Sequence, residues 1–222
     1  MVFNVFIRVI LATSLLTGIV ATKDDERPTL RLFSEHLEKP FPKSPARSRT
    51  CRVHPRGSGR DDAANILKAV TKCNNGGRVV IEGDITIASL LDLTFLNGID
   101  IAILGTINFT DDVNYWVDHT FKYAFQYSSA FWRFGGKDVN IYGNGAGNIN
   151  GSGQTWYAEV AVNSTLLRPI RFVLDGVEGG SLSGLTFLNS PNVSQRNRPY
   201  ATPADPPAVV HSHSQQFRCH RQ

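Results

Sequence analysis

Three pairs of adjacent aspartates are the first candidates for carboxylate chemistry in this chain. They are Asp24–Asp25, Asp61–Asp62 and Asp111–Asp112. General acid–base chemistry depends on carboxyls that are held in position around a reacting bond. The first pair lies in a charged, proline-dotted segment, the second at the predicted start of a helix and the third in a loop. None of these places indicates a catalytic arrangement, so no catalytic residue is predicted.

Basic side chains offer a second set of candidates. His119 follows Asp118, but adjacent residues on a strand face opposite ways, so we expect His119 on the surface. Arg168 and Arg171 could each bind a carboxylate through two hydrogen bonds. As isolated residues they are expected to be ordinary surface or strand-edge charges. His211 and His213 have nothing nearby to complete a zinc site, so neither a metal site nor a cofactor is predicted.

The first 21 residues have the form of a secretory signal. Arg8 precedes an apolar run at residues 9–16, and small residues at 17–21 suit cleavage after Ala21. A membrane anchor is the alternative, but the run is too short to span a bilayer well. We therefore predict a secreted, extracellular protein that is not bound to a membrane.

Export changes how the three cysteines and the asparagine sequons are interpreted. In an oxidising compartment Cys51 and Cys73 are predicted to form a disulfide, which leaves Cys219 unpaired. Four N-x-Ser/Thr acceptor sequences begin at Asn108, Asn150, Asn163 and Asn192. Asn163, in a polar segment, is the best glycosylation candidate, and Asn150, at a predicted corner, is the least certain.

Composition excludes several classes of protein. The chain has 222 residues and a formal charge of +4, but four arginines of residues 193–222 and Arg8 of the leader account for the imbalance. Residues 22–192 are formally neutral, so a nucleic-acid-binding surface is not predicted. With 41% hydrophobic and 19% charged residues, the chain is not disordered as a whole.

A helix and a series of short strands are predicted along the chain. Residues 22–50 are expected to form an extended N-terminal arm. Asp61 is the predicted N-cap of a helix in which Ala63, Ile66, Leu67 and Val70 share one face, and residues 75–77 (Asn-Gly-Gly) end it. Four pairs of short β-branched strands follow, and each pair is separated by a Gly- or Asn-bearing corner. The pairs are 79–81 with 85–87, 99–104 with 106–109, 139–142 with 148–150, and 171–174 with 182–188.

Such short, irregularly spaced strands favour a solenoid, in which each coil is stabilised by stacking on its neighbours. A β-sandwich is the alternative. The predicted helix is placed to cap the first coil. An aromatic-rich stretch at 111–134 could stack on sugar rings, but an excursion packed against the coils is the favoured interpretation.

Residues 193–222 differ from everything before them. They contain no glycine, a single acidic residue, four prolines and three histidines. No strand or helix pattern is visible, so this tail is predicted to be disordered. The abrupt change at Val193 is typical of a reading-frame change or a retained intron, and compositional drift at a true C-terminus is the alternative.

Three segments carry a resemblance to a known family. Residues 139–157 (VNIYGNGAGNINGSGQTWY) resemble the glycine-spaced coil of pectin-degrading polygalacturonases, glycoside hydrolase family 28. Residues 73–95 and 176–192 resemble the same family, in particular fungal exopolygalacturonases. The resemblance runs from about residue 51 to 192. It implies an all-β fold: a right-handed parallel β-helix, here a truncated solenoid with an N-terminal capping helix.

The resemblance also implies an activity. Polygalacturonases hydrolyse α-1,4-galacturonosyl bonds by inversion, which needs an acid carboxyl on one side of the bond and a carboxylate base on the other. The four family motifs that supply these groups and hold the substrate are absent from this sequence. We therefore predict a secreted, monomeric, exopolygalacturonase-like chain that has pectin as its partner but is inactive by itself. A non-catalytic pectin-binding or decoy protein is the alternative, and a calcium-dependent lyase is disfavoured because no carboxylate cluster is visible.

Overall fold

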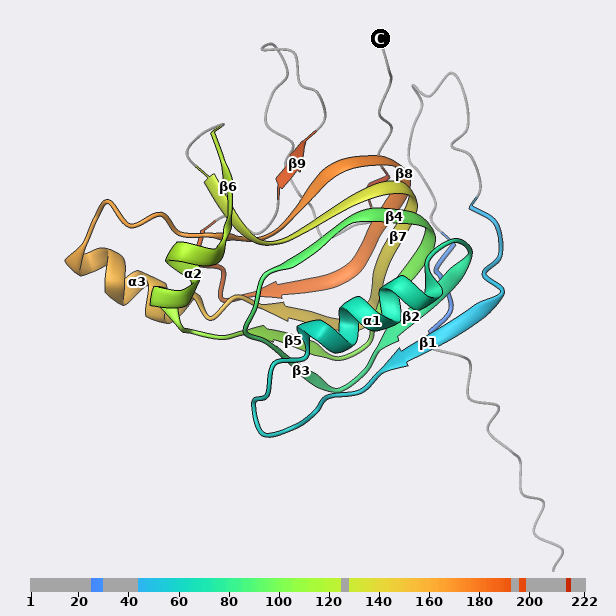
Figure 1. Cartoon of the computed structure of the whole chain (residues 1–222), viewed down its shortest axis with the longest axis horizontal. Helices are drawn as coiled ribbons and strands as arrows, with labels where there is room; N and C mark the ends of the chain where they lie inside the picture. The colour runs from blue at the N-terminus through green and yellow to red at the C-terminus, as the bar shows by residue number, and fades with distance from the viewer. Residues whose placement is uncertain (1–24, 30–43, 125–127, 193–195, 199–214, 217–222) are drawn as a thin grey trace, which may run out of the picture.

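The computed structural model describes residues 25–29, 44–124 and 128–192, and the backbone of two short strands beyond them. Strands dominate these residues (Figure 1). The elements are β1 (Arg49–Val53), α1 (Ala63–Cys73), β2 (Gly77–Ile81), β3 (Asp84–Ile87), β4 (Leu91–Ile103), β5 (Thr106–Phe109), α2 (Val113–His119), β6 (Phe121–Tyr123), β7 (Ser128–Asn150), α3 (Gly153–Val162), β8 (Ile170–Leu188), β9 (Arg196–Arg198) and β10 (Gln215–Gln216).

The strands form stacked parallel coils. Segments of β2, β3, β4, β5, β7 and β8 pair in parallel with the equivalent segments of neighbouring coils along three separate stacks, whereas β6 pairs antiparallel with the start of β7. The stacked positions are Val79, Ile101, Ile141 and Leu182 in the first stack, Ile85, Ile107, Ile149 and Phe187 in the second, and Leu93, Phe134 and Leu174 in the third. The predicted parallel β-helix is confirmed, and the strand pairs seen in the sequence are successive sides of one coil rather than hairpins.

The core lies inside the coils and is rich in aromatic side chains. Phe109 stacks on Phe131 with ring centroids 4.5 Å apart, and Trp116 and Trp132 meet Phe109 edge to face. Trp156 of α3 is also fully buried. Trp116, Phe131, Trp132 and Phe134 of the aromatic stretch are therefore buried in the core, where they cannot stack on sugar rings.

The aromatic stretch and two helices differ from what the sequence predicts. Residues 128–134 are not part of an excursion, because they form the start of β7 and the wall of the third strand stack. α2 and α3 were not predicted, and both lie toward the left of the view in Figure 1. Each buries little apolar surface beyond one tryptophan, Trp116 or Trp156, so neither shows a periodic apolar face in the sequence.

Helix α1 caps the first coil. It lies across the end of the stack in Figure 1 and buries Ile66 and Val70 against the coil core. Its N-cap is Asp62, one residue after the predicted Asp61, and its last residue is Cys73, just before the predicted stop. Leu67 is 40% exposed although it was assigned to the apolar face. The capping role itself is as predicted.

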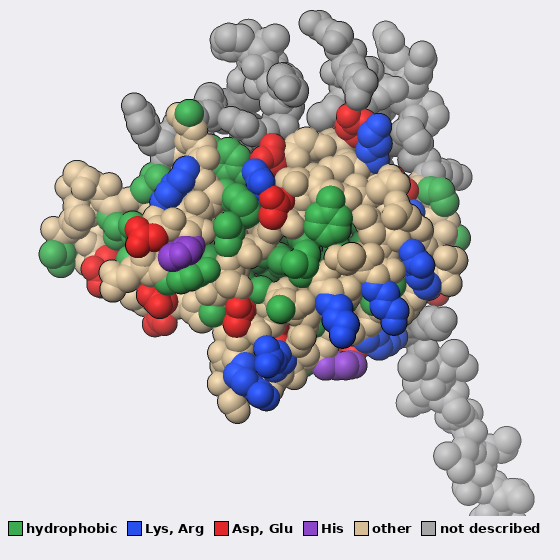
Figure 2. Space-filling model, viewed as in Figure 1, with side chains coloured by type: hydrophobic (Ala, Val, Ile, Leu, Met, Phe, Trp, Pro, Cys, Tyr) green, Lys and Arg blue, Asp and Glu red, His purple; other side chains and the backbone are tan. Residues whose placement is uncertain are grey.

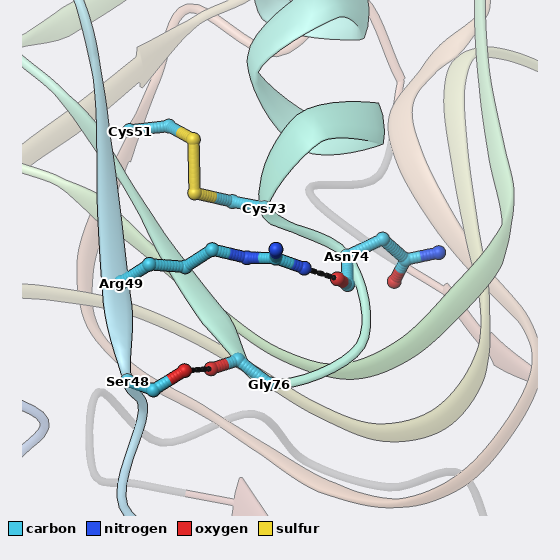
Figure 3. Close-up of a disulfide and its surroundings, with 6 residues drawn as sticks. All are labelled: Ser48, Arg49, Cys51, Cys73, Asn74 and Gly76. Carbon is cyan, nitrogen blue, oxygen red and sulfur yellow. Dashed lines mark hydrogen bonds between the residues drawn. A yellow bond between two sulfur atoms is a disulfide. The ribbon is translucent and has the colours of Figure 1, made fainter.

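A disulfide joins Cys73 at the end of α1 to Cys51 in β1 (Figure 3), as the sequence predicted. The same junction is held by hydrogen bonds to backbone carbonyls. Arg49 donates from Nη2 to Asn74 O at 2.6 Å, and the Ser48 hydroxyl donates to Gly76 O at 3.3 Å. The capping helix is thus fixed to the first strand by both covalent and polar contacts.

Replacing Cys51 and Cys73 together by alanine is expected to lower the free energy of unfolding by about 3 kcal/mol, because the bridge restricts the unfolded chain. Urea denaturation under non-reducing conditions measures this change. A reducing agent should bring the parent protein down to the stability of the double variant and leave the variant unaffected. Equal denaturation midpoints for the two oxidised proteins would contradict the prediction.

Three predicted segments lie wholly or largely outside the described residues: the signal, the tail, and the N-terminal arm at 22–50, of which only 25–29 and 44–50 are described. The signal at 1–21 lies entirely outside them, as does most of the tail, 193–195, 199–214 and 217–222. Within the tail, β9 pairs in parallel with β8 and β10 pairs antiparallel with it. The disorder and the origin of the tail stay predictions. In the part of the chain that the structure describes, no helix is long and apolar enough to cross a bilayer.

Candidate functional site

The carboxylates of the Asp61–Asp62 pair have structural partners on the coils and the segment before α1. The Asp61 carboxylate accepts hydrogen bonds from Ala88 N at 3.0 Å and from the Ser89 hydroxyl at 2.6 Å. Asp62 accepts from the backbone N–H of Arg56 and of Thr86. This pair therefore fixes the start of α1 to the first coil rather than facing a reactant.

The other two aspartate pairs are also poor candidates for catalysis. Asp112 caps α2 by accepting a hydrogen bond from Tyr115 N at 3.0 Å. Asp25 lies in the N-terminal arm and forms ion pairs with Arg52 at 2.9 Å and Arg78 at 3.7 Å. Its neighbour Asp24 lies outside the described residues. The structure thus gives Asp112 a capping role and Asp25 a role in docking the arm, and Asp111 is exposed beside the cap.

A buried ion-pair network holds the N-terminal arm against the coils. The Asp100 carboxylate accepts hydrogen bonds from Arg27 at 3.1 Å and from Arg47 at 2.9 Å, and Arg47 also donates to Asp138 at 2.9 Å. The side chains of Asp100 and Arg47 are only 1% and 3% exposed. Burial alone would lower the pKa of Arg47, but its hydrogen bonds to Asp138 and Asp100 raise it on balance. The network is therefore a charged anchor for the arm.

A polar ladder continues this anchor from coil to coil. Asp100, Asn140 and Ser181 occupy equivalent positions in successive coils. Asn140 donates to Asp100 at 3.1 Å, and the Ser181 hydroxyl donates to Asn140 at 2.8 Å. This ladder was not predicted from the sequence. The sequence does contain a polar residue at the equivalent position of three strand segments. Because the coils differ in length, however, equivalent positions cannot be recognised until the register between the strands is known.

Arg133 is the centre of a second cluster, at the start of the third strand stack. It donates a hydrogen bond to Asp92, lies 3.9 Å from Asp175 and stands over the Phe121 ring at 4.4 Å. Burial alone would raise the pKa of Asp92, but hydrogen bonds from Arg133 and Thr94 hold it below its ordinary value. An aspartate kept ionised in this way cannot donate a proton at neutral pH, so Asp92 is not suited to be a general acid.

The two arginines considered for carboxylate binding have different environments. Arg171 is fully buried, which corrects the expectation of a surface or strand-edge charge. It donates hydrogen bonds to the carbonyls of Ile149 and Leu188 across neighbouring coils, and burial lowers its pKa to about 10. Arg171 therefore links neighbouring coils inside the protein, where a substrate cannot contact it. Arg168 stands over the half-exposed Tyr157 ring at 5.5 Å.

His119 is exposed at the end of α2, as expected of a surface histidine. Its ring stacks on Tyr115 with centroids 4.1 Å apart, and its Nδ1 lies 2.8 Å from the Tyr115 carbonyl. Among the described residues, no group of His, Cys, Asp and Glu side chains has the arrangement of a metal site.

Figure 2 shows Lys and Arg side chains gathered over α1 and β1. Among the described residues that the sequence singled out, Asp25, Asp61, Asp62 and Arg171 hold the arm, the cap and the coils together, and no reactive pair is seen.

The amino-acid sequence of this chain is similar to those of fungal exopolygalacturonases. The exopolygalacturonase of Cochliobolus carbonum is 49% identical over 148 residues, which are 66% of this chain and 33% of that protein. Exopolygalacturonase A of Aspergillus niger is 44% identical over 177 residues, 78% of this chain and 40% of that protein. The chain is a relative of the fungal exopolygalacturonases. It spans between a third and two fifths of the length of these curated relatives, and no known protein-family profile matches it.

Solved structures agree on the fold. An endo-xylogalacturonan hydrolase from Aspergillus tubingensis has a TM-score of 0.58 at 28% identity and covers 67% of this chain and 39% of its own. A polygalacturonase from Erwinia carotovora has a TM-score of 0.51 at 20% identity and covers 72% of this chain and 46% of its own. The parallel coils seen here are therefore shared with the xylogalacturonan hydrolase of Aspergillus tubingensis and the polygalacturonase of Erwinia carotovora.

Proposed function

We propose that residues 51–192 are coils of a secreted exopolygalacturonase that hydrolyses α-1,4-galacturonosyl bonds of pectin with inversion. The observation that carries the proposal is the 44–49% identity to fungal exopolygalacturonases. The parallel coils described above support it. In this account the described coils, with their cap and anchored arm, are a scaffold on which the rest of such an enzyme stacks.

We further propose that the 222 residues do not hydrolyse pectin by themselves. Inversion requires a proton-donating carboxyl and a carboxylate that activates water, placed on opposite sides of the bond. The family's motifs for these groups are absent from the sequence, and the aspartates described above are occupied by caps and ion pairs. With no pair of free, opposed carboxyls among them, we assign these residues a structural role.

Incubation of the purified chain with polygalacturonate tests this proposal. We expect no release of new reducing ends above the buffer control, whereas a fungal exopolygalacturonase in the same assay releases galacturonate. Release that scales with the concentration of the chain would contradict the proposed inactivity. Retardation of the chain in a gel that contains polygalacturonate, without hydrolysis, would instead support the pectin-binding or decoy alternative.

A further inference from the structure

The sequon at Asn163 has a different setting from the others in this chain. Asn163 follows α3, and the residues 163–165 (Asn-Ser-Thr) are all exposed. The Thr165 hydroxyl donates to Asn163 Oδ1 at 2.7 Å, and Thr165 N donates to the same oxygen at 3.2 Å. Val162, the preceding residue, is 89% exposed. The amide nitrogen of Asn163 thus lies at a protruding end of the molecule, with space around it.

Asn108 and Asn150 are instead built into the coils. They occupy paired positions of β5 and β7, and Asn150 donates from Nδ2 to Asn108 Oδ1 at 3.0 Å. Asn189 donates to Asn150 Oδ1 at 3.2 Å, which extends the stack to a third coil. The Ser152 hydroxyl of the Asn150 sequon donates to Phe109 O at 2.7 Å. Both the acceptor amide and the hydroxyl of this sequon are therefore used by the fold.

We propose that Asn163 is the N-glycan acceptor of the folded protein, in preference to Asn108 and Asn150, which form a structural asparagine stack. Transfer replaces one N–H of Asn163 Nδ2 by a bond to the anomeric carbon of a polyprenyl-diphosphate-linked oligosaccharide. The lipid diphosphate leaves and the proton passes to solvent. The same substitution on Asn150 would put a sugar between two stacked coils and disturb the hydrogen bond to Asn108. This inference rests on the predicted export of the chain, which is also part of the proposed function, but not on the proposed hydrolase role.

Asn192 is not included in the comparison of the Asn163, Asn108 and Asn150 sequons. Its Nδ2 donates to Arg168 O at 3.1 Å, and the remaining two residues of its sequon lie outside the described residues. The glycan expected on Asn163 extends from the C-terminal end of α3, on the side of the molecule where α2 also lies (Figure 1).

Peptide mapping of protein made in a yeast secretory pathway tests the proposal. The full chain is expressed once with its own first 21 residues and once with a host leader in their place, so that failure to enter the pathway is recognised. Soluble monomer is treated with a glycosidase in ¹⁸O-labelled water, which converts occupied asparagines to labelled aspartates. We expect the label at Asn163 and none at Asn108 or Asn150. An unlabelled Asn163, or labelling at Asn150 equal to that at Asn163, would overturn the proposal.

A second test measures the glycan content of variants on a denaturing gel. It uses all of the protein that is made, folded or not, so a variant that fails to fold still gives a result. Asn163→Gln and Thr165→Val should each remove one glycan, seen as faster migration on a denaturing gel. Thr165→Ser keeps an acceptor sequence and should retain the glycan. Ser152→Ala removes the Asn150 sequon but keeps Asn150, and should not change migration. A glycan lost on Ser152→Ala but retained on Asn163→Gln would overturn the proposal.

Discussion

Replacing Asp100 by alanine is expected to lower the free energy of unfolding by about 3–5 kcal/mol, the cost of breaking a buried ion pair from one side. Asp100 accepts hydrogen bonds from Arg27, Arg47 and Asn140. Removing the carboxylate leaves the Arg47 guanidinium buried with Asp138 as its remaining anionic partner. Because arginine does not lose its proton in proteins, the charge cannot be relieved by neutralisation. The arm should therefore detach, or the fold lose stability.

Lys137→Ala is the matched control for this prediction. Lys137 is paired with Glu178 at 3.3 Å, but its side chain is 63% exposed. Loss of such a surface pair should change the free energy of unfolding by no more than about 1 kcal/mol. Urea denaturation of both variants measures the difference. A loss of less than about 1 kcal/mol for Asp100→Ala would show that the buried network does not hold the arm.

Replacing Gly136 by alanine is the second change with a large expected effect. A Cβ at Gly136 would lie 1.8 Å from the Leu96 carbonyl oxygen of the preceding coil, and Gly136 has a φ of +114°. The clash is with backbone, so a side-chain rotation cannot relieve it. Overpacking and backbone strain each cost about 1–3 kcal/mol, so we expect a loss of about 4 kcal/mol in unfolding free energy.

Gly145→Ala separates these two contributions. Gly145 also has a positive φ, +83°, but a Cβ there would meet nothing within 4 Å. Its variant should therefore lose only the strain contribution, about 1 kcal/mol. Thermal unfolding of the two variants measures the comparison. Equal melting temperatures would mean that the coils can separate at Gly136, contrary to the tight stacking described here.

The coils were predictable from the sequence because their signals are local. β-branched runs beside glycine corners mark strand segments, and the spacing of residues 139–157 carries the family resemblance. The disulfide followed from cysteine position and export. α2 and α3 were missed because each is held by one buried tryptophan rather than by a repeating apolar face. Residues 171–174 of the third strand stack were predicted as a strand, but its segment in β7 was missed because Phe131, Trp132 and Phe134 fit an aromatic excursion equally well.

The roles of individual polar residues depend on register, which the sequence does not display. Asp100, Asn140 and Ser181 are 40 and 41 residues apart, yet their side chains are in contact. Arg171 was expected at the surface because charged residues rarely lie inside, but carbonyls of two coils receive its hydrogen bonds. Contacts of this kind emerge only when one coil is placed on the next.

The most direct test of the central claim is a chimera. Residues 51–192 replace the aligned segment of the Aspergillus niger exopolygalacturonase, which keeps its own remaining residues, and galacturonate release from polygalacturonate is measured. If these residues are exopolygalacturonase coils, the folded chimera should hydrolyse polygalacturonate within about a hundredfold of the parent rate, which allows for a misplacement of about 1 Å at the site. A chimera that is monomeric and folded by circular dichroism but releases no galacturonate would contradict the account.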